Sequence, residues 1–140
     1  MIRFTVPAVP VAQPRPRAYI AGQRARMGTV AETHKVNSFK SAVMHAAALA
    51  YDGPPLDCPL AMSIVFVMPR PTSKCWKSKP MPREPYAAKK NDWDNLGKSV
   101  CDALNKRLFT DDGLLCDVRV SRVIAAGDEQ PHVTVEIETI

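Results

Sequence analysis

The sequence predicts a small α/β domain with a mixed sheet of about four strands and two main helices. Several segments are apolar or alternate between apolar and polar residues, and two others place apolar residues three or four apart, which is helical spacing. In chain order these segments read strand, helix, strand, helix, strand, strand, which is typical of helices packed on a sheet. With 140 residues, 46% of them apolar, the chain is expected to form one domain over residues 1–140.

The first strand is expected at residues 2–9, where Ile2, Phe4 and Val6 alternate with polar residues. Pro7 and Pro10 limit it, because proline donates no hydrogen bond to a sheet.

A proline-rich arm with two arginines, Arg15 and Arg17, follows at residues 13–17. Proline keeps such an arm extended, and the forked guanidinium groups suit phosphates. A solvated loop without function is the equal alternative.

The first helix is expected from Thr29 or Thr33, either of which could cap it, to about Asp52. Gly53 and the prolines after it end the helix. Its apolar face consists of Val36, Phe39, Val43, Ala46, Ala47 and Ala50.

Residues 60–68 are apolar at nearly every position, which predicts a strand covered on both faces and ended by Pro69. A long basic loop, expected to be flexible, follows at about residues 70–91 and contains Trp76 and Tyr86 among its cations. Cations interleaved with aromatic rings suit phosphates and unstacked bases. A mobile loop without function is the alternative.

The second helix is expected at residues 94–106, with Leu96, Val100, Ala103 and Leu104 on its apolar face. Alternation then predicts a third strand at residues 114–121 and a fourth at residues 133–138, with a turn at Gly127 between them.

The net charge of +5 favours an anionic partner, usually a nucleic acid. The four cysteines form no C-x-x-C pair, so a zinc site is not expected and reduced thiols are. We find no signal peptide and no span long enough for a membrane, which predicts a cytoplasmic protein.

An acidic motif stands out in this basic chain. Asp92 and Asp94 lie two apart, and in an extended segment such residues point the same way and could share a cation. Asp112 could add a third carboxylate after the helix. Mg²⁺ prefers such oxygen ligands, and it can polarise a phosphodiester. Lys98, one helical turn after Asp94, could hold the phosphate.

Each of these residues also has a plain structural interpretation. Asp92 or Asp94 could be only an N-cap, and Asp94 with Lys98 only an i,i+4 salt bridge. Asp111 and Asp112 could be only a turn. Asp102 is expected to be a solvated helix residue, and Asp117 an outward strand residue near the site.

The run Asp92-x-Asp94-Asn95-Leu96-x-Lys98, followed by Asp102-Ala103-Leu104-Asn105 and Asp111-Asp112, resembles the RusA-type Holliday junction resolvases. Val9-Pro10 and the arm at residues 13–17 resemble the start of that family. The resemblance implies a small dimeric endonuclease that uses Mg²⁺, with Mn²⁺ as a substitute, to nick two strands of a four-way junction.

The family's catalytic and metal-binding carboxylates would fall on Asp92, Asp94 and Asp112, and its essential lysine on Lys98. The chain departs from the family where Asn91 replaces a frequent proline and Leu114 a frequent glutamine.

The sequence thus predicts a homodimeric, Mg²⁺-dependent nuclease of bacterial or phage origin that acts on junction DNA in repair and recombination. The residues expected to contact DNA are Arg15, Arg17, Lys74, Lys77, Lys79, Lys89 and Lys90. The alternatives are a less selective nuclease for flaps or branched DNA, and a DNA-binding module whose acidic cluster is structural.

Overall fold

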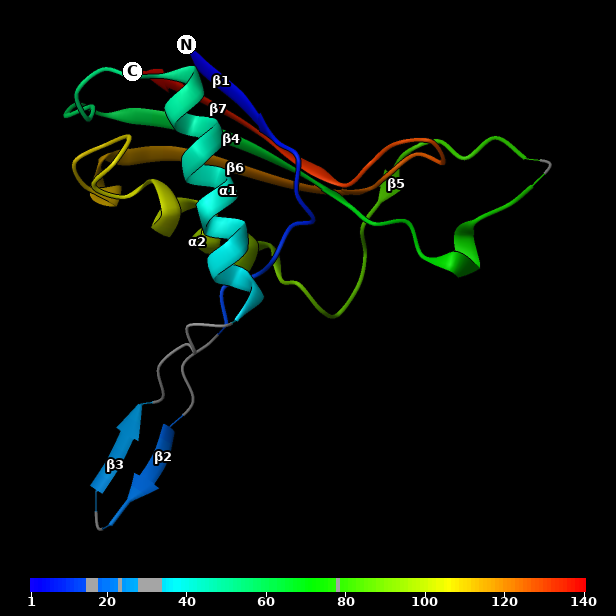
Figure 1. Ribbon diagram of the computed structural model, residues 1–140, viewed down its shortest axis with the longest axis horizontal. Helices are drawn as coiled ribbons and strands as arrows, with labels where there is room; N and C mark the ends of the chain where they lie inside the picture. Colours follow the sequence, from blue (N-terminus) through cyan, green and yellow to red (C-terminus); the bar gives the residue numbers. More distant parts are fainter. Residues whose placement is uncertain (15–17, 23, 28–33, 78) are drawn as a thin grey trace.

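A mixed sheet forms the centre of the protein, and both helices pack on one of its faces (Figure 1). The computed structural model describes residues 1–14, 18–22, 24–27, 34–77 and 79–140. In this part of the chain the sheet has five strands in the order β1-β7-β4-β6-β5. All neighbours are antiparallel except the parallel pair β4 and β6. The predicted α/β class, with two helices and a mixed sheet, is confirmed.

The elements follow the predicted order with two additions. The sheet consists of β1 (Ile2–Val6), β4 (Leu60–Met68), β5 (Glu84–Pro85), β6 (Leu115–Ile124) and β7 (His132–Thr139). The helices are α1 (Lys35–Ala50) and α2 (Trp93–Leu104). The first addition is a separate antiparallel hairpin of β2 (Ala18–Ala21) and β3 (Arg24–Met27), which Figure 1 shows extending away from the sheet. The second is β5, at the sheet edge.

The core lies between the sheet and the two helices. Phe66 and Ile64 of β4 and Val135 of β7 are fully buried in it, together with Phe109 after α2. Burial of such side chains contributes about 1.5–3 kcal/mol each. The face of the sheet away from the helices carries mainly polar side chains, so the molecule has two layers.

The prediction that the strand at residues 60–68 is covered on both faces is wrong for most of its length. Ala61, Ser63 and Val65 point away from the helices and are only half-buried, whereas Val67 is buried. Small and β-branched residues pack well on a half-exposed pleated surface, so their apolar character does not require a second layer.

Helix α1 begins later than expected. Its N-cap is His34, whose Nδ1 accepts a hydrogen bond from the backbone N–H of Val36 at 3.0 Å. The prediction that Thr29 or Thr33 caps the helix is therefore wrong, and both threonines lie outside the described residues. An imidazole nitrogen supplies the acceptor that a hydroxyl group supplies in the usual cap.

Helix α2 is held close to β6 by its glycine. A Cβ added at Gly97 would lie 3.3 Å from Cγ2 of Val120, closer than a comfortable carbon contact. The neighbouring Ser99 is fully buried and donates its hydroxyl to the carbonyl of Leu96 at 2.7 Å. Leu96, Val100 and Leu104 face the core as predicted, and this packing fixes where the two ends of α2 lie.

In the described part of the chain, no helix has the length and hydrophobicity needed to cross a bilayer. All four cysteines are free.

Candidate metal and nucleic-acid site

Asp92 and Asp94 lie at the N-terminal end of α2 and are both exposed. Asp92 is the N-cap residue, with extended backbone angles of φ −53° and ψ 143°, and its carbonyl accepts the first helical bond from Leu96 at 3.0 Å. Asp94 already belongs to the first helical turn. The extended segment on which the sequence argument relied therefore stops at Asp92, and strand alternation does not align the two carboxylates.

The end of a helix favours negative charge for a different reason. The first backbone N–H groups of α2 have no partner within the helix, and the aligned peptide dipoles place partial positive charge there. The side chain of Asp92 makes no capping hydrogen bond to α2. The interpretation of Asp92 as only an N-cap is thus not supported by a cap bond.

Lys98 lies one turn further along α2, with its side chain 60% exposed. Its Nζ is 3.5 Å from Oδ1 of Asp102, the residue one turn later. Asp102 also lies 4.0 Å from Nζ of Lys40 on α1. Asp102 is therefore not simply solvated as expected, because it pairs with Lys98 within α2 and joins α2 to α1 through Lys40.

Asp111 and Asp112 have different surroundings although they are adjacent. The carboxylate of Asp111 accepts a 2.7 Å hydrogen bond from the N–H of Gly113 and caps the short 3-10 helix η2 (Asp112–Leu114). The backbone N–H of Asp112 donates to Oδ1 of Asn105 at 3.1 Å, which ties this turn to the end of α2. Both aspartates are exposed, but only the side chain of Asp111 has a hydrogen-bond partner within the turn among the described residues.

The partly buried thiol of Cys101 locates Asp112 relative to α2. Burial, together with the negative charges of Asp102 and Asp112, raises the pKa of this thiol to about 11. Asp112 therefore lies near the C-terminal half of α2, whereas Asp92 and Asp94 lie at its N-terminal end.

The three aspartates do not form a closed metal cage. Among the residues that the structure describes, no three His, Cys, Asp or Glu side chains are close enough to hold one ion. Mg²⁺ is commonly held by only one or two protein carboxylates, with water and substrate phosphate completing its shell. Exposed carboxylates of Asp92 and Asp94 at a helix end supply that donor chemistry, so the residues fit such an ion.

The N-terminal segment reaches the same end of α2. The backbone N–H of Gln13 donates to the carbonyl of Asn95 at 2.9 Å. The side-chain oxygen of Gln13 is buried and has no hydrogen-bond partner among the residues that the structure describes. The proline-rich arm therefore begins beside the candidate site, but the predicted DNA contacts Arg15 and Arg17 lie outside the described residues.

The basic loop contains more structure than the sequence predicted. It carries a 3-10 turn, η1 (Thr72–Lys74), and the edge strand β5. Arg70 organises it, because its side chain is only 5% exposed and donates to the carbonyls of Lys74, Pro82 and Ala125 at 2.8–3.0 Å. The same guanidinium donates to Glu84 at 2.9 Å and lies 5.3 Å from the Trp76 ring centroid.

The lysines of this loop that were predicted to contact DNA differ in their exposure to solvent. Lys77, Lys79, Lys89 and Lys90 are exposed, and Lys79 lies 5.7 Å from the ring of Trp76. Lys74 is half-buried, 3.6 Å from Glu84. A second hydrogen-bonded ion pair, in which the guanidinium of Arg83 donates to Glu129, joins the loop to the turn before β7.

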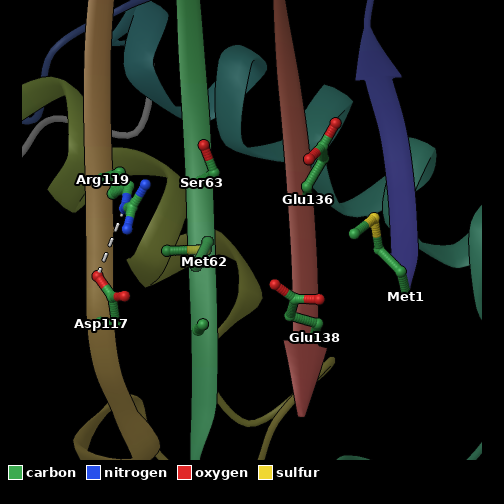
Figure 2. Close-up of a pocket in the computed structure, with 8 residues that line it drawn as sticks. Met1, Met62, Ser63, Asp117, Arg119, Glu136 and Glu138 are labelled. Carbon is green, nitrogen blue, oxygen red and sulfur yellow. Dashed lines mark ion pairs between the residues drawn. The ribbon is translucent and has the colours of Figure 1, made fainter. Parts of the chain in front are cut away.

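Asp117 lies on the sheet face that the helices leave open. Figure 2 shows it there beside Arg119, 3.9 Å away, with Glu136 and Glu138 of β7 across β4 and the helices behind the sheet. The expectation that Asp117 lies near the site is wrong, because Val120, on the opposite face of β6, is the residue that meets α2. An outward strand residue was expected and is found.

Trp93 was missed by the sequence analysis. It stands between the two aspartates and is 59% exposed, although a tryptophan at the start of an amphipathic helix would ordinarily pack inward. Helical spacing puts it in line with Leu96, so periodicity alone gave no signal of its exposure.

The fold and the site together define a small basic α/β protein with exposed carboxylates and a lysine along one helix. A family model described as Endodeoxyribonuclease RusA matches residues 7–138, nearly the whole chain, so the protein belongs to the RusA endodeoxyribonuclease family. It is also 33% identical over 143 residues to the uncharacterized protein YqaN of Bacillus subtilis (strain 168), which covers 99% of this chain and 96% of that protein.

Proposed function

We propose that the protein is a Mg²⁺-dependent, structure-specific endodeoxyribonuclease that resolves Holliday junctions by paired nicks in DNA repair and recombination. Membership of an endodeoxyribonuclease family supports nuclease chemistry. The observation that carries the proposal is the exposed pair Asp92 and Asp94 at the positive end of α2, with Lys98 one turn away. The proposed site of action is the cytoplasm, at the nucleoid.

In this proposal Asp92, Asp94 and Asp112 hold the cation, with Mn²⁺ as a substitute for Mg²⁺. When bound, such an ion polarises the scissile phosphodiester and lowers the pKa of an attacking water. Since Asp112 lies towards the other end of α2, it would act as a ligand together with Asp92 and Asp94 only after a movement of the η2 turn.

Lys98 holds the phosphate and balances the charge that develops on it. The weak 3.5 Å contact with Asp102 is easily exchanged for a phosphate oxygen, and Asp102 then keeps Lys40 as its partner. The exposed loop lysines contact the DNA backbone, and a homodimer would place two such sites on opposing strands.

The decisive assay compares cleavage of a four-way junction, a flap and linear duplex, each in Mg²⁺ and in EDTA. Junction-selective, EDTA-sensitive cutting supports the proposal. Equal cutting of flap and junction would indicate a less selective branched-DNA nuclease, and binding without cutting would indicate a DNA-binding module.

Replacing one aspartate at a time tests the residue roles, and the chain offers a matched control. Asp92→Asn, Asp94→Asn and Asp112→Asn should each reduce cleavage by about 100-fold or more, while metal-free junction binding holds or improves because a repulsive charge is gone. Asp111→Asn keeps an oxygen that can cap η2 and should cleave normally. Substantial cleavage by folded Asp94→Asn protein would contradict its assignment.

A further inference from the structure

The residue directly before the acidic motif has an unusual backbone conformation. Asn91 has φ +55°, in the left-handed region, and among the described residues only Lys106 is another non-glycine residue with positive φ. This conformation is unfavourable for L-residues, and asparagine tolerates it better than most. Such a backbone persists where surrounding contacts hold it, so the contacts of Asn91 are informative.

Two side chains, one directly after β5 and one on β6, hold Asn91 in place. Its amide Nδ2 donates to the hydroxyl oxygen of Tyr86, which follows β5, at 3.2 Å. Its carbonyl oxygen accepts from Nη1 of Arg122, on β6, at 3.0 Å. The guanidinium of Arg122 lies 5.3 Å from the centroid of the Tyr86 ring, and all three residues are partly buried.

The two partners are themselves fixed to each other by the sheet. The backbone N–H of Tyr86 donates to the carbonyl of Arg122 at 3.3 Å, just beyond the short ladder between β5 and β6. The orientation of Asn91 is therefore set by Tyr86 and Arg122, which a backbone hydrogen bond at the sheet edge joins to each other. We call Tyr86, Asn91 and Arg122 the Asn91 cluster.

The cluster acts on Asp92 through one peptide group. The carbonyl that Arg122 holds belongs to the peptide group that joins Asn91 to Asp92. The direction of this carbonyl therefore fixes the orientation of the peptide plane before Asp92. The carbonyl of Asp92 is fixed on the other side by the N–H of Leu96 at 3.0 Å. The backbone of Asp92 is thus held from both sides while its carboxylate is exposed.

We propose that the Asn91 cluster is a positioning unit that orients Asp92 toward the divalent cation. The inference rests on the proposed function, because it takes Asp92 as a metal ligand. Ligands held by supporting contacts lose less freedom when they bind an ion, and loss of such contacts typically weakens metal affinity by roughly 10–100-fold. Tyr86 and Arg122 touch neither ion nor substrate in this proposal; they act through Asn91.

Two substitutions weaken the cluster with little change to the fold. Tyr86→Phe removes only the hydroxyl group that accepts from Asn91. Asn91→Gly removes the side chain but keeps a backbone that adopts positive φ freely. Tyr51→Phe is the matched control, because it also removes one hydroxyl hydrogen bond, to the carbonyl of Pro54 at 2.7 Å, at the end of α1.

Three measurements are made on each protein: Mn²⁺ binding without DNA by the loss of the free-ion EPR signal, junction binding in EDTA, and Tm. We expect Tyr86→Phe and Asn91→Gly to weaken Mn²⁺ binding about tenfold and to raise the half-saturating Mg²⁺ concentration for cleavage equally. The cleavage rate at saturating Mg²⁺, metal-free junction binding and Tm should stay near those of Tyr51→Phe.

The outcomes separate this inference from the proposed function. If the parent protein binds Mn²⁺ in a manner that Asp92→Asn abolishes, but Tyr86→Phe and Asn91→Gly bind it equally well, the positioning role is refuted and the metal site stands. A lower Tm with unchanged Mn²⁺ affinity would show a purely structural cluster. If the parent shows no Mn²⁺ binding that depends on Asp92, the metal site itself is refuted, and the positioning role with it.

Discussion

Replacing Arg70 with methionine tests whether one buried guanidinium organises the basic loop. The side chain is only 5% exposed, and its bonds reach three carbonyl oxygens and the carboxylate of Glu84. Removing one member of a buried, hydrogen-bonded charge pair costs about 3–5 kcal/mol. Glu84 is 30% exposed and keeps Lys74 at 3.6 Å, which favours the lower end, about 3 kcal/mol.

The expected change in Tm follows from the length of the chain. At about 2.1 cal/mol/K per residue, unfolding 140 residues has an entropy near 0.3 kcal/mol/K, so a loss of 3 kcal/mol lowers Tm by about 10 °C. Scanning calorimetry measures this shift. Because the bonds fasten residues 71–77 and 79–83 to the end of β6, part of the loss should appear as faster amide exchange in those residues.

Two control variants sharpen the test. Lys77→Met makes the same kind of change at an exposed position and should alter stability by less than about 0.5 kcal/mol. Arg70→Lys keeps the charge but lacks the planar fork, so it should recover only a small part of the loss. If Arg70→Met resembled Lys77→Met in both Tm and exchange, the organising role of Arg70 would be wrong.

Three further predictions concern pH, DNA and assembly. Arg83 holds the pKa of Glu129 at about 2, below the ordinary value of 4.5, so this pair stabilises the fold above pH 4.5 and its contribution is lost as pH falls to 2. Glu129→Gln should remove about 1 kcal/mol of that acid sensitivity, a figure reduced because Arg83 is half-exposed. An unchanged acid-denaturation curve would argue against the pair. Three loop lysines, Lys74, Lys77 and Lys79, are replaced together with alanine. This change should weaken junction binding and flatten the slope of log K against log salt, whereas an unaltered slope would exclude the three lysines as phosphate contacts. Sedimentation at micromolar concentration should give twice the chain mass, and a monomer that still makes paired cuts would contradict the dimer.

Much of the fold could be predicted because long periodic segments were unambiguous. Residues 60–68 and the amphipathic pattern around Leu96 gave β4 and α2 with nearly correct bounds. The strand β5 has two residues, one of them Pro85, and the hairpin strands have four each, so no period could be detected. Their existence depends on partners far away in the chain.

The candidate site, like the fold, could be predicted only in part from the sequence. The sequence located Asp92, Asp94 and Lys98 around the start of a helix, and the structure places that start at Trp93. It could not show that Asp94 is already helical, or that the carboxylate of Asp111 caps the η2 turn. The role of Arg70 was equally hidden, because nothing local indicates which distant carbonyls will converge on one cation.

The outer edge of β6 has a consequence for amide exchange. This strand has ten residues, but in the described part of the chain β5 pairs only with Val123 and Ile124. From Leu115 to Ser121, alternate backbone N–H groups point away from β4, at an edge whose side chains are largely exposed. Deuterium should therefore enter this strand at every second residue, giving a periodic protection pattern along its first seven residues.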